Sequence, residues 1–239
     1  MSVPTTEFTA RTTDIPGLII FDVTSVGDER GYFQEKYQKA KLVAAGLPED
    51  FNVVQNSVSY NKQAGVTRGF HAEPWDKYIS VITGKVFSAY VDLRKGDSFG
   101  KVVTVEITPN VAIFLPQGVA NSFQTLEQDT YYIYSVNNHW SADNYDKYCF
   151  VNLGDPALGV DWPISLDSAV LSERDRNHPP LADVTPLEVY MGNKMTLVTG
   201  ANGQLGRALR VEFPNADFVT REYLDITSPD LSNACQWED

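Results

Sequence analysis

Residues 87–93, Phe87-Ser88-Ala89-Tyr90-Val91-Asp92-Leu93, alternate in side-chain type with the two-residue period of a β-strand, and residues 103–107 repeat that period. Thr83-Gly84-Lys85 predicts a hairpin turn just before the first of these runs. Further strand-like runs are Leu18–Val23, Asn52–Tyr60, Val111–Leu115 and Thr130–Val136. One early helix is predicted over Tyr37–Ala45, where Gly46 ends it and Pro48 follows. Many short strands with few helices predict a mainly β fold, a jelly-roll sandwich or barrel whose interior can hold a ligand.

Composition excludes several classes of function. The chain has 239 residues with 43% apolar and 21% charged side chains, as is ordinary for a globular protein. We find no leader pattern and no apolar run of membrane-spanning length, and Cys149 and Cys235 have no metal or redox spacing, so we expect a cytoplasmic protein and no membrane partner. The net charge of −12 argues against nucleic acid, because a nucleic-acid-binding protein needs a basic face. An anionic small molecule would need Arg and Lys residues that converge locally.

The sequence pattern changes at Met195. A short apolar strand over residues 196–199 leads into Gly200-Ala201-Asn202-Gly203-Gln204-Leu205-Gly206 and then a helical run to Phe213. Strand, glycine-rich turn and helix in this order are typical of an α/β protein. We therefore predict a jelly-roll domain over residues 1–182, a linker over 183–194, and a short βαβ fragment of a Rossmann fold over 195–239.

Three histidines narrow the search for chemistry. His71 lies in Arg68-Gly69-Phe70-His71-Ala72-Glu73-Pro74-Trp75-Asp76-Lys77. In this segment His71 can accept a proton near neutral pH, Lys77 can stabilise an oxyanion, and Arg68 can hold a phosphate. The alternative is a structural histidine flanked by surface charges. A metal site is not predicted, because His71, His139 and His178 are isolated in the sequence.

Five ordered segments resemble the dTDP-4-dehydrorhamnose 3,5-epimerase family over about residues 10 to 182. They are Gly27–Glu35, Arg68–His71, Lys77, Pro116–Phe123 and Leu171–Asp175. The resemblance implies a cupin-like jelly roll and an isomerase that moves protons beside the C4 ketone of a dTDP-4-keto-6-deoxy sugar. No cofactor is implied, because the substrate's own ketone serves as the electron sink.

The resemblance also assigns catalytic roles. His71 corresponds to the base, Asp175 to the carboxylate that orients it, Lys77 to the group that stabilises the enolate, and Tyr134 to the acid on the other face. Two alternatives come from local pattern. Ser172-x-x-Asp175 is also a helix-capping pattern, and Tyr134 lies among three tyrosines that suit a core or an interface.

The substrate-binding residues implied by the same resemblance are Arg30, Phe33, Glu35, Gln55, Arg68 and Asn121. In the family the residues matching Arg30, Phe33 and Glu35 reach the nucleotide of a partner subunit, which implies a homodimer with shared sites. The alternative for Arg30 and Glu35 is that they are solvated turn charges. Asn121 stands where many members have histidine, and it cannot titrate near neutral pH. This departure leaves His71 as the only imidazole base that the sequence indicates.

The C-terminal segment resembles the start of dTDP-4-dehydrorhamnose reductase. Gly200, Gly203 and Gly206 correspond to its nucleotide loop, with the spacing of short-chain reductases. NADPH or NADH is therefore expected only with an intact reductase domain. A Tyr-x-x-x-Lys pair occurs at Tyr37 and Lys41, but it precedes the loop and we interpret it as coincidence. We expect a bifunctional parent cut short after its first domain, and no reductase activity from this chain.

The predicted function is 3,5-epimerisation of dTDP-4-dehydro-6-deoxy-D-glucose in dTDP-L-rhamnose biosynthesis. Two alternatives remain open from the sequence. One is an epimerase acting at a single carbon, or a related keto-isomerase. The other is a non-catalytic module that binds sugar nucleotides, against which the joint presence of His71, Lys77 and Tyr134 argues.

Overall fold

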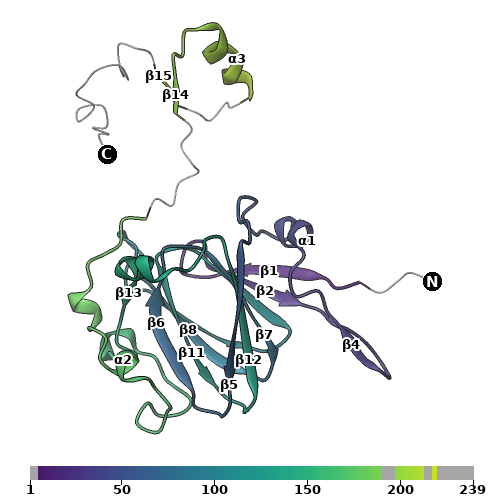
Figure 1. Cartoon of the computed structure of the whole chain (residues 1–239), viewed down its shortest axis with the longest axis vertical. Helices are drawn as coiled ribbons and strands as arrows, with labels where there is room; N and C mark the ends of the chain where they lie inside the picture. Colours follow the sequence, from purple (N-terminus) through teal and green to yellow (C-terminus); the bar gives the residue numbers. More distant parts are fainter. Residues whose placement is uncertain (1–4, 190–196, 213–216, 220–239) are drawn as a thin grey trace. The chain divides into compact units, whose positions relative to one another are not determined.

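The computed structural model describes residues 5–189, 197–212 and 217–219 (Figure 1). The chain divides into two compact units, Met1–Val189 and Tyr190–Asp239. Among the described residues, no helix combines the length and the apolar character needed to span a membrane.

Two antiparallel sheets build the first unit. The six-stranded sheet has the order β1-β2-β10-β7-β12-β5, and the five-stranded sheet has the order β13-β6-β11-β8-β9. The strands of the first sheet are β1 (Phe8–Thr12), β2 (Ile19–Val23), β5 (Gln55–Asn61), β7 (Lys77–Thr83), β10 (Val111–Leu115) and β12 (Thr130–Val136). Those of the second are β6 (Thr67–Ala72), β8 (Val86–Asp92), β9 (Val102–Ile107), β11 (Val119–Thr125) and β13 (Cys149–Phe150). The predicted mainly β jelly-roll fold is confirmed.

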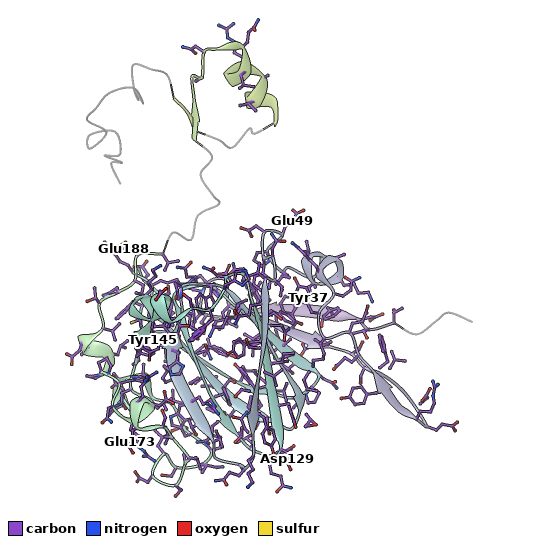
Figure 2. All side chains as sticks on the ribbon, viewed as in Figure 1. Tyr37, Glu49, Asp129, Tyr145, Glu173 and Glu188 are labelled. Atoms are coloured by element: carbon purple, nitrogen blue, oxygen red, sulfur yellow. The ribbon has the colours of Figure 1, made fainter. Side chains whose placement is uncertain are left out.

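A short hairpin and several short helices accompany the two sheets. A hairpin of β3 (Val26–Asp28) and β4 (Gly31–Phe33) extends away from the sheets (Figure 1). The helices of the first unit are α1 (Lys39–Ala44), η1 (Ala142–Lys147), η2 (Pro156–Leu158), α2 (Glu173–Arg176) and η3 (Leu181–Asp183). Figure 2 labels Tyr145 on η1 and Glu173 on α2, which lie on the same side of the unit as β13 and β6.

The main core lies between the two sheets. Ile79, Val81 and Ile113 come from the six-stranded sheet and pack with Tyr90 and Val119 from the five-stranded sheet, all of them buried. Burial of this apolar surface is the main contribution to the stability of the fold.

Further layers cover the outer faces of both sheets. On the five-stranded sheet, Phe70, Ala89 and Val91 pack against Val151 and Leu153. On the six-stranded sheet, Phe21 and Phe114 pack against Leu42 of α1. Every residue of β8 except Phe87 is therefore fully buried, although its alternating sequence is typical of a strand with one exposed face.

The predicted elements agree with the structure at most positions. The predicted bounds of β10 and β12 are those observed, and Gly84, with φ of +84°, turns the chain between β7 and β8. The predicted helix over Tyr37–Ala45 is confirmed as the shorter α1, because Gln38 caps it by accepting a hydrogen bond from the Lys41 backbone N–H.

The first unit continues past residue 182. Val184 is buried, and Leu187 exchanges backbone hydrogen bonds with Leu93 and Lys95. The first residues of the predicted linker thus pack on the jelly roll up to Val189, while residues 190–196 lie outside the described residues.

The second unit contains β14 (Leu197–Thr199), α3 (Gln204–Glu212) and β15 (Asp217–Val219). Its two strands pair in parallel, with the helix between them in the sequence. This arrangement is the predicted βαβ unit. A dinucleotide-binding fold and the resemblance to a reductase remain predictions.

Candidate active site

A cavity between the two sheets gathers three of the four predicted catalytic residues, together with Asn121. His71 on β6 and Asn121 on β11 belong to the five-stranded sheet and lie opposite each other in register. Lys77 on β7 and Tyr134 on β12 belong to the six-stranded sheet. All four line one cavity of about 190 Å³, several times the roughly 30 Å³ that one water occupies.

Gly69 sets the spacing of two strands at this cavity. A Cβ atom at this residue would lie 2.5 Å from the Ser122 Cβ and 2.6 Å from the Asn121 carbonyl oxygen on β11. The φ of Gly69 is also +121°, which side chains other than glycine rarely allow. Glycine in the Arg68-Gly69-Phe70-His71 segment therefore lets β6 approach β11 and places His71 next to Asn121.

Asp175 reaches His71 from α2. The His71 Nε2 atom lies 2.8 Å from the Asp175 Oδ1 atom. Ser172 is the N-cap of α2 and accepts a hydrogen bond from the Asp175 backbone N–H. The helix-capping pattern is thus present, and it leaves the Asp175 side chain free to meet the histidine.

The charge state of Asp175 fixes the roles of the two His71 nitrogens. Burial alone raises the pKa of this carboxyl, but hydrogen bonds and charge from His71, with hydrogen bonds from Ser172 and His178, lower the pKa below its usual value. An ionised carboxylate only accepts hydrogen bonds, so the His71 Nε2 atom carries a proton and donates it. In the neutral ring the lone pair is then on Nδ1, which is the basic atom.

His178 is a second imidazole at this carboxylate, and the sequence analysis missed it. Its Nε2 atom lies 3.2 Å from the same Asp175 Oδ1 atom. The histidines are isolated in the sequence, but the fold brings two of them together: the side-chain N and O atoms of His71, Asp175 and His178 that could bind a metal lie within 4.8 Å of one another. The spacing of three residues between Asp175 and His178 was the available indication. The absence of a metal from the mechanism stays a prediction.

Lys77 is held by one partner from the β6–β7 turn and one from β11. Its Nζ atom lies 2.5 Å from Glu73 Oε2 and donates a 2.8 Å hydrogen bond to Asn121 Oδ1. The ammonium group also lies 5.5 Å from the centre of the Tyr134 ring. A lysine has three donors. In the part of the chain that the structure describes, Glu73 and Asn121 engage two of them, and the third is available to bind an oxygen in the cavity. The sequence analysis did not identify Glu73 as a site residue.

Tyr134 has the protonation state that an acid needs. Burial, and next the negative charge of Glu73, raise the pKa of its phenol, and these effects outweigh opposing ones from Ser57 and Arg68. The hydroxyl therefore keeps its proton at neutral pH. The alternative role for Tyr134 was that of a core or interface aromatic, and its ring does lie beside that of Tyr132. Tyr134 also lines the cavity.

Arg68 and Gln55 lie at the borders of this cavity. Arg68 lines both the cavity and an adjoining hollow that contains His71, Arg174 and Asp175. Two guanidinium groups beside His71 supply the local positive charge that an anionic ligand needs in a chain of net charge −12. Gln55 lines a neighbouring hollow with Tyr134 and Glu73.

The remaining predicted binding residues do not join the cavity of their own chain. Arg30 and Phe33 lie on the β3–β4 hairpin, where Phe33 is 65% exposed and Arg30 pairs with Asp28. Glu35 forms an ion pair with Lys41. None of the three lines the cavity that contains His71.

The predicted nucleotide loop has the local geometry of a tight turn before a helix. Gly200 has a φ of +73°, and a Cβ atom on Gly206 would lie 2.5 Å from the Gly200 carbonyl oxygen. The Gly203 backbone N–H donates to that same carbonyl group. Binding of a nucleotide at these glycines remains a prediction.

Comparison with known proteins places the first unit in a family. The sequence profile of the dTDP-4-dehydrorhamnose 3,5-epimerase family matches residues 12–183. The chain is 50% identical over 179 residues to a protein described as an RmlC homolog from Streptococcus pyogenes, covering 73% of this chain and 90% of that one. It is 34% identical over 184 residues to a dTDP-4-dehydrorhamnose 3,5-epimerase from Methanothermobacter thermautotrophicus, covering 74% and 96%.

A solved structure agrees. RmlC from Streptococcus suis in complex with dTDP-D-xylose has a TM-score of 0.72 and 46% identity, covering 76% of this chain and 95% of that one. The family match ends at residue 183, before β14, α3 and β15. With this fold, this cavity and a profile match over most of its length, the chain belongs to the dTDP-4-dehydrorhamnose 3,5-epimerase family.

Proposed function

We propose that this chain inverts C3 and C5 of dTDP-4-dehydro-6-deoxy-D-glucose, with His71 as the base and Tyr134 as the acid. One observation carries the proposal. A basic imidazole and a protonated phenol come from opposite sheets and line one cavity, beside a lysine that has a donor to spare. Inversion requires that a proton leave one face of the sugar and return to the other, and the two walls supply the two groups.

The base step begins at the Nδ1 atom of His71. The C4 ketone acidifies the C3 proton, and Nδ1 removes it while the electron pair moves into an enolate on O4. The imidazolium that forms is stabilised by the Asp175 carboxylate 2.8 Å from Nε2. The remaining donor of Lys77 stabilises the charge on O4, as a preorganised cation does in a buried site. Lys77 is only 5% exposed, so water screens this interaction little.

The acid step ends at Tyr134. Its hydroxyl returns a proton to C3 on the opposite face, and exchange with solvent restores both groups. The same sequence at C5 completes the reaction. The sugar's ketone is the electron sink throughout, so these residues need no redox group.

Recognition of the nucleotide is assigned to the hollow next to His71. Arg68 and Arg174 line it, and guanidinium groups suit the oxygens of a diphosphate. The Streptococcus suis relative was solved with a dTDP-sugar, which supports a substrate of this class. We further propose a homodimer in which Arg30, Phe33 and Glu35 reach the partner's nucleotide, since the β3–β4 hairpin leaves Tyr32 and Phe33 exposed.

The direct test is incubation with dTDP-4-dehydro-6-deoxy-D-glucose in heavy water, followed by NMR. The wild-type chain should incorporate deuterium at C3 and C5 and yield the doubly inverted product. His71→Ala should lower incorporation at both carbons by about 10²–10⁴-fold, because a positioned base is lost. His139→Ala removes an exposed histidine that does not line this cavity, and should leave the rate unchanged. Deuterium at one carbon only would replace this function with a single-carbon epimerase.

A further inference from the structure

His71 and His178 share one carboxylate oxygen. Asp175 Oδ1 lies 2.8 Å from His71 Nε2 and 3.2 Å from His178 Nε2. Because the ionised carboxylate can only accept, His178 meets it as the Nε2–H tautomer. The general mechanism of proton abstraction uses His71 and Asp175, and it leaves the second imidazole without a role.

The surroundings of His178 hold it in place. It is 8% exposed, and its ring stacks on Phe150 with ring centres 4.6 Å apart and planes inclined by 12°. Asn152 Nδ2 donates a 3.1 Å hydrogen bond to the His178 carbonyl oxygen. Phe150 also meets the His71 ring edge-on at 5.5 Å. The two imidazoles are thus packed about one aromatic ring and one carboxylate.

We propose that His178 is a positioning residue, which holds the Asp175 carboxylate toward His71 and limits the negative charge that this carboxylate presents to the base. The inference rests on the proposed function of His71. Without His178 the carboxylate would keep His71 and Ser172 as partners, but a second donor on Oδ1, the oxygen that meets His71, adds a restraint on rotation about the Cβ–Cγ bond. A donor to Oδ1 also withdraws charge from the bond that Oδ1 makes with His71, so the base is less strongly biased toward the imidazolium.

The charged and titratable groups near His178 influence its protonation state. Asp175 and Arg174 face it from α2, and His71 faces it from β6, while β13 contributes the uncharged Phe150. Burial, together with the nearby His71 and Arg174, lowers the pKa of His178 against the opposing effect of Asp175. The lowered pKa favours the neutral form of His178, which can still donate from Nε2 to Asp175.

The first test needs no activity. NMR with ¹⁵N-labelled histidine resolves three imidazoles, and His71→Ala, His139→Ala and His178→Ala assign them. In the wild-type protein at pH 8, His178 should be the Nε2–H tautomer. The Nδ1–H tautomer would overturn the proposal, since that ring cannot donate to Asp175.

In His178→Ala the titration midpoint of His71 should rise by a few tenths to one unit. His178→Gln, whose amide can donate to the same oxygen, should restore the midpoint. An unchanged midpoint in His178→Ala would contradict the charge-limiting role.

The second test measures catalysis. His178→Ala should lower kcat for deuterium incorporation by about tenfold, the loss typical of one hydrogen bond to a charged group, with little change in KM. His178→Gln should recover most of the rate. In an Asp175→Ala background the His178→Ala change should cost less than about twofold, because its partner is already gone. Equal losses in both backgrounds would mean that His178 acts on packing alone. If the wild-type chain is active and His178→Ala has no effect, this inference is wrong and the proposed function stands. If the wild-type chain is inactive, both are wrong.

Discussion

Lys77 and Asn121 lie on different sheets, and the Lys77 ammonium donates a 2.8 Å hydrogen bond to the Asn121 side-chain oxygen across the cavity. Both residues are at most 9% exposed. The bond gives Asn121 a part in the site, although its side chain cannot titrate near neutral pH. An amide oxygen accepts from the ammonium whenever the lysine is protonated, whereas an imidazole in its place would also have to be neutral.

This relationship predicts unequal effects of two alanine substitutions. Lys77→Ala should lower kcat by about 10²-fold or more, because it removes the charge that stabilises the enolate oxygen. Asn121→Ala should cost about tenfold, since Lys77 keeps Glu73 as a partner. Single-turnover kinetics on both variants measure the difference. A larger loss from Asn121→Ala would show that Asn121, and not Lys77, makes the main contact with the substrate.

Tyr134→Phe should separate two measurable events. His71 still removes protons in this variant, so deuterium should enter the substrate at the original configuration. Net inversion should fall by about 10²-fold further than exchange, because the opposite wall has lost its acid. Time courses by NMR record both rates in one sample. An equal decline in exchange and inversion would reduce Tyr134 to a residue that shapes the cavity.

Much of the fold could be predicted because local pattern and tertiary structure agree. Residues 111–115 and 130–136 are short runs with strand-like composition, and each is a strand with the predicted bounds. The burial of both faces of β8 could not be predicted in the same way. It depends on the segment around Val151 and Leu153, which covers the outer face from more than fifty residues away.

The site residues could be predicted from the sequence where they lie together in one short segment. Arg68–Lys77 contains both His71 and Lys77, and it also contains Glu73, which the turn between β6 and β7 brings back to the lysine. His178 was missed because its importance depends on α2 lying against β6. No property of residues 172–178 alone reveals that contact, although the three-residue spacing places His178 near Asp175.

The buried His178 predicts a pH dependence of stability. Its pKa is lowered from 6.5 in the folded chain, chiefly by burial, so the unfolded chain binds the proton more readily. As pH falls below about 6.5 the unfolded state gains protons first, and the free energy of unfolding should decrease until the folded pKa is also passed. Urea titrations of the wild type and of His178→Gln at pH 7.5 and 5.5 measure this effect. Between the two pH values the wild type should lose more unfolding free energy than the variant does. If the two proteins differ in unfolding free energy by the same amount at both pH values, the pKa of His178 is the same in the folded and the unfolded chain.

The exposed hairpin leads to a prediction about shared sites. Arg30 and Phe33 belong to the β3–β4 hairpin, which extends away from the two sheets of its own chain (Figure 1). Neither residue lines the cavity that contains His71. If the hairpin completes a partner's site, Arg30→Ala and His71→Ala should each be inactive as homodimers for different reasons. Co-refolding the two variants should produce heterodimers in which one site contains both mutations and the other contains neither. Random mixing at equal amounts makes about half of the dimers mixed, each with one intact site, so the mixture should recover about a quarter of the wild-type rate. The control mixes His71→Ala with Asp175→Ala; these two residues contact each other within one chain, so the variants should not complement. Native mass spectrometry confirms that subunits have exchanged, and an inactive mixture after proven exchange would assign Arg30 to its own chain or to no site at all.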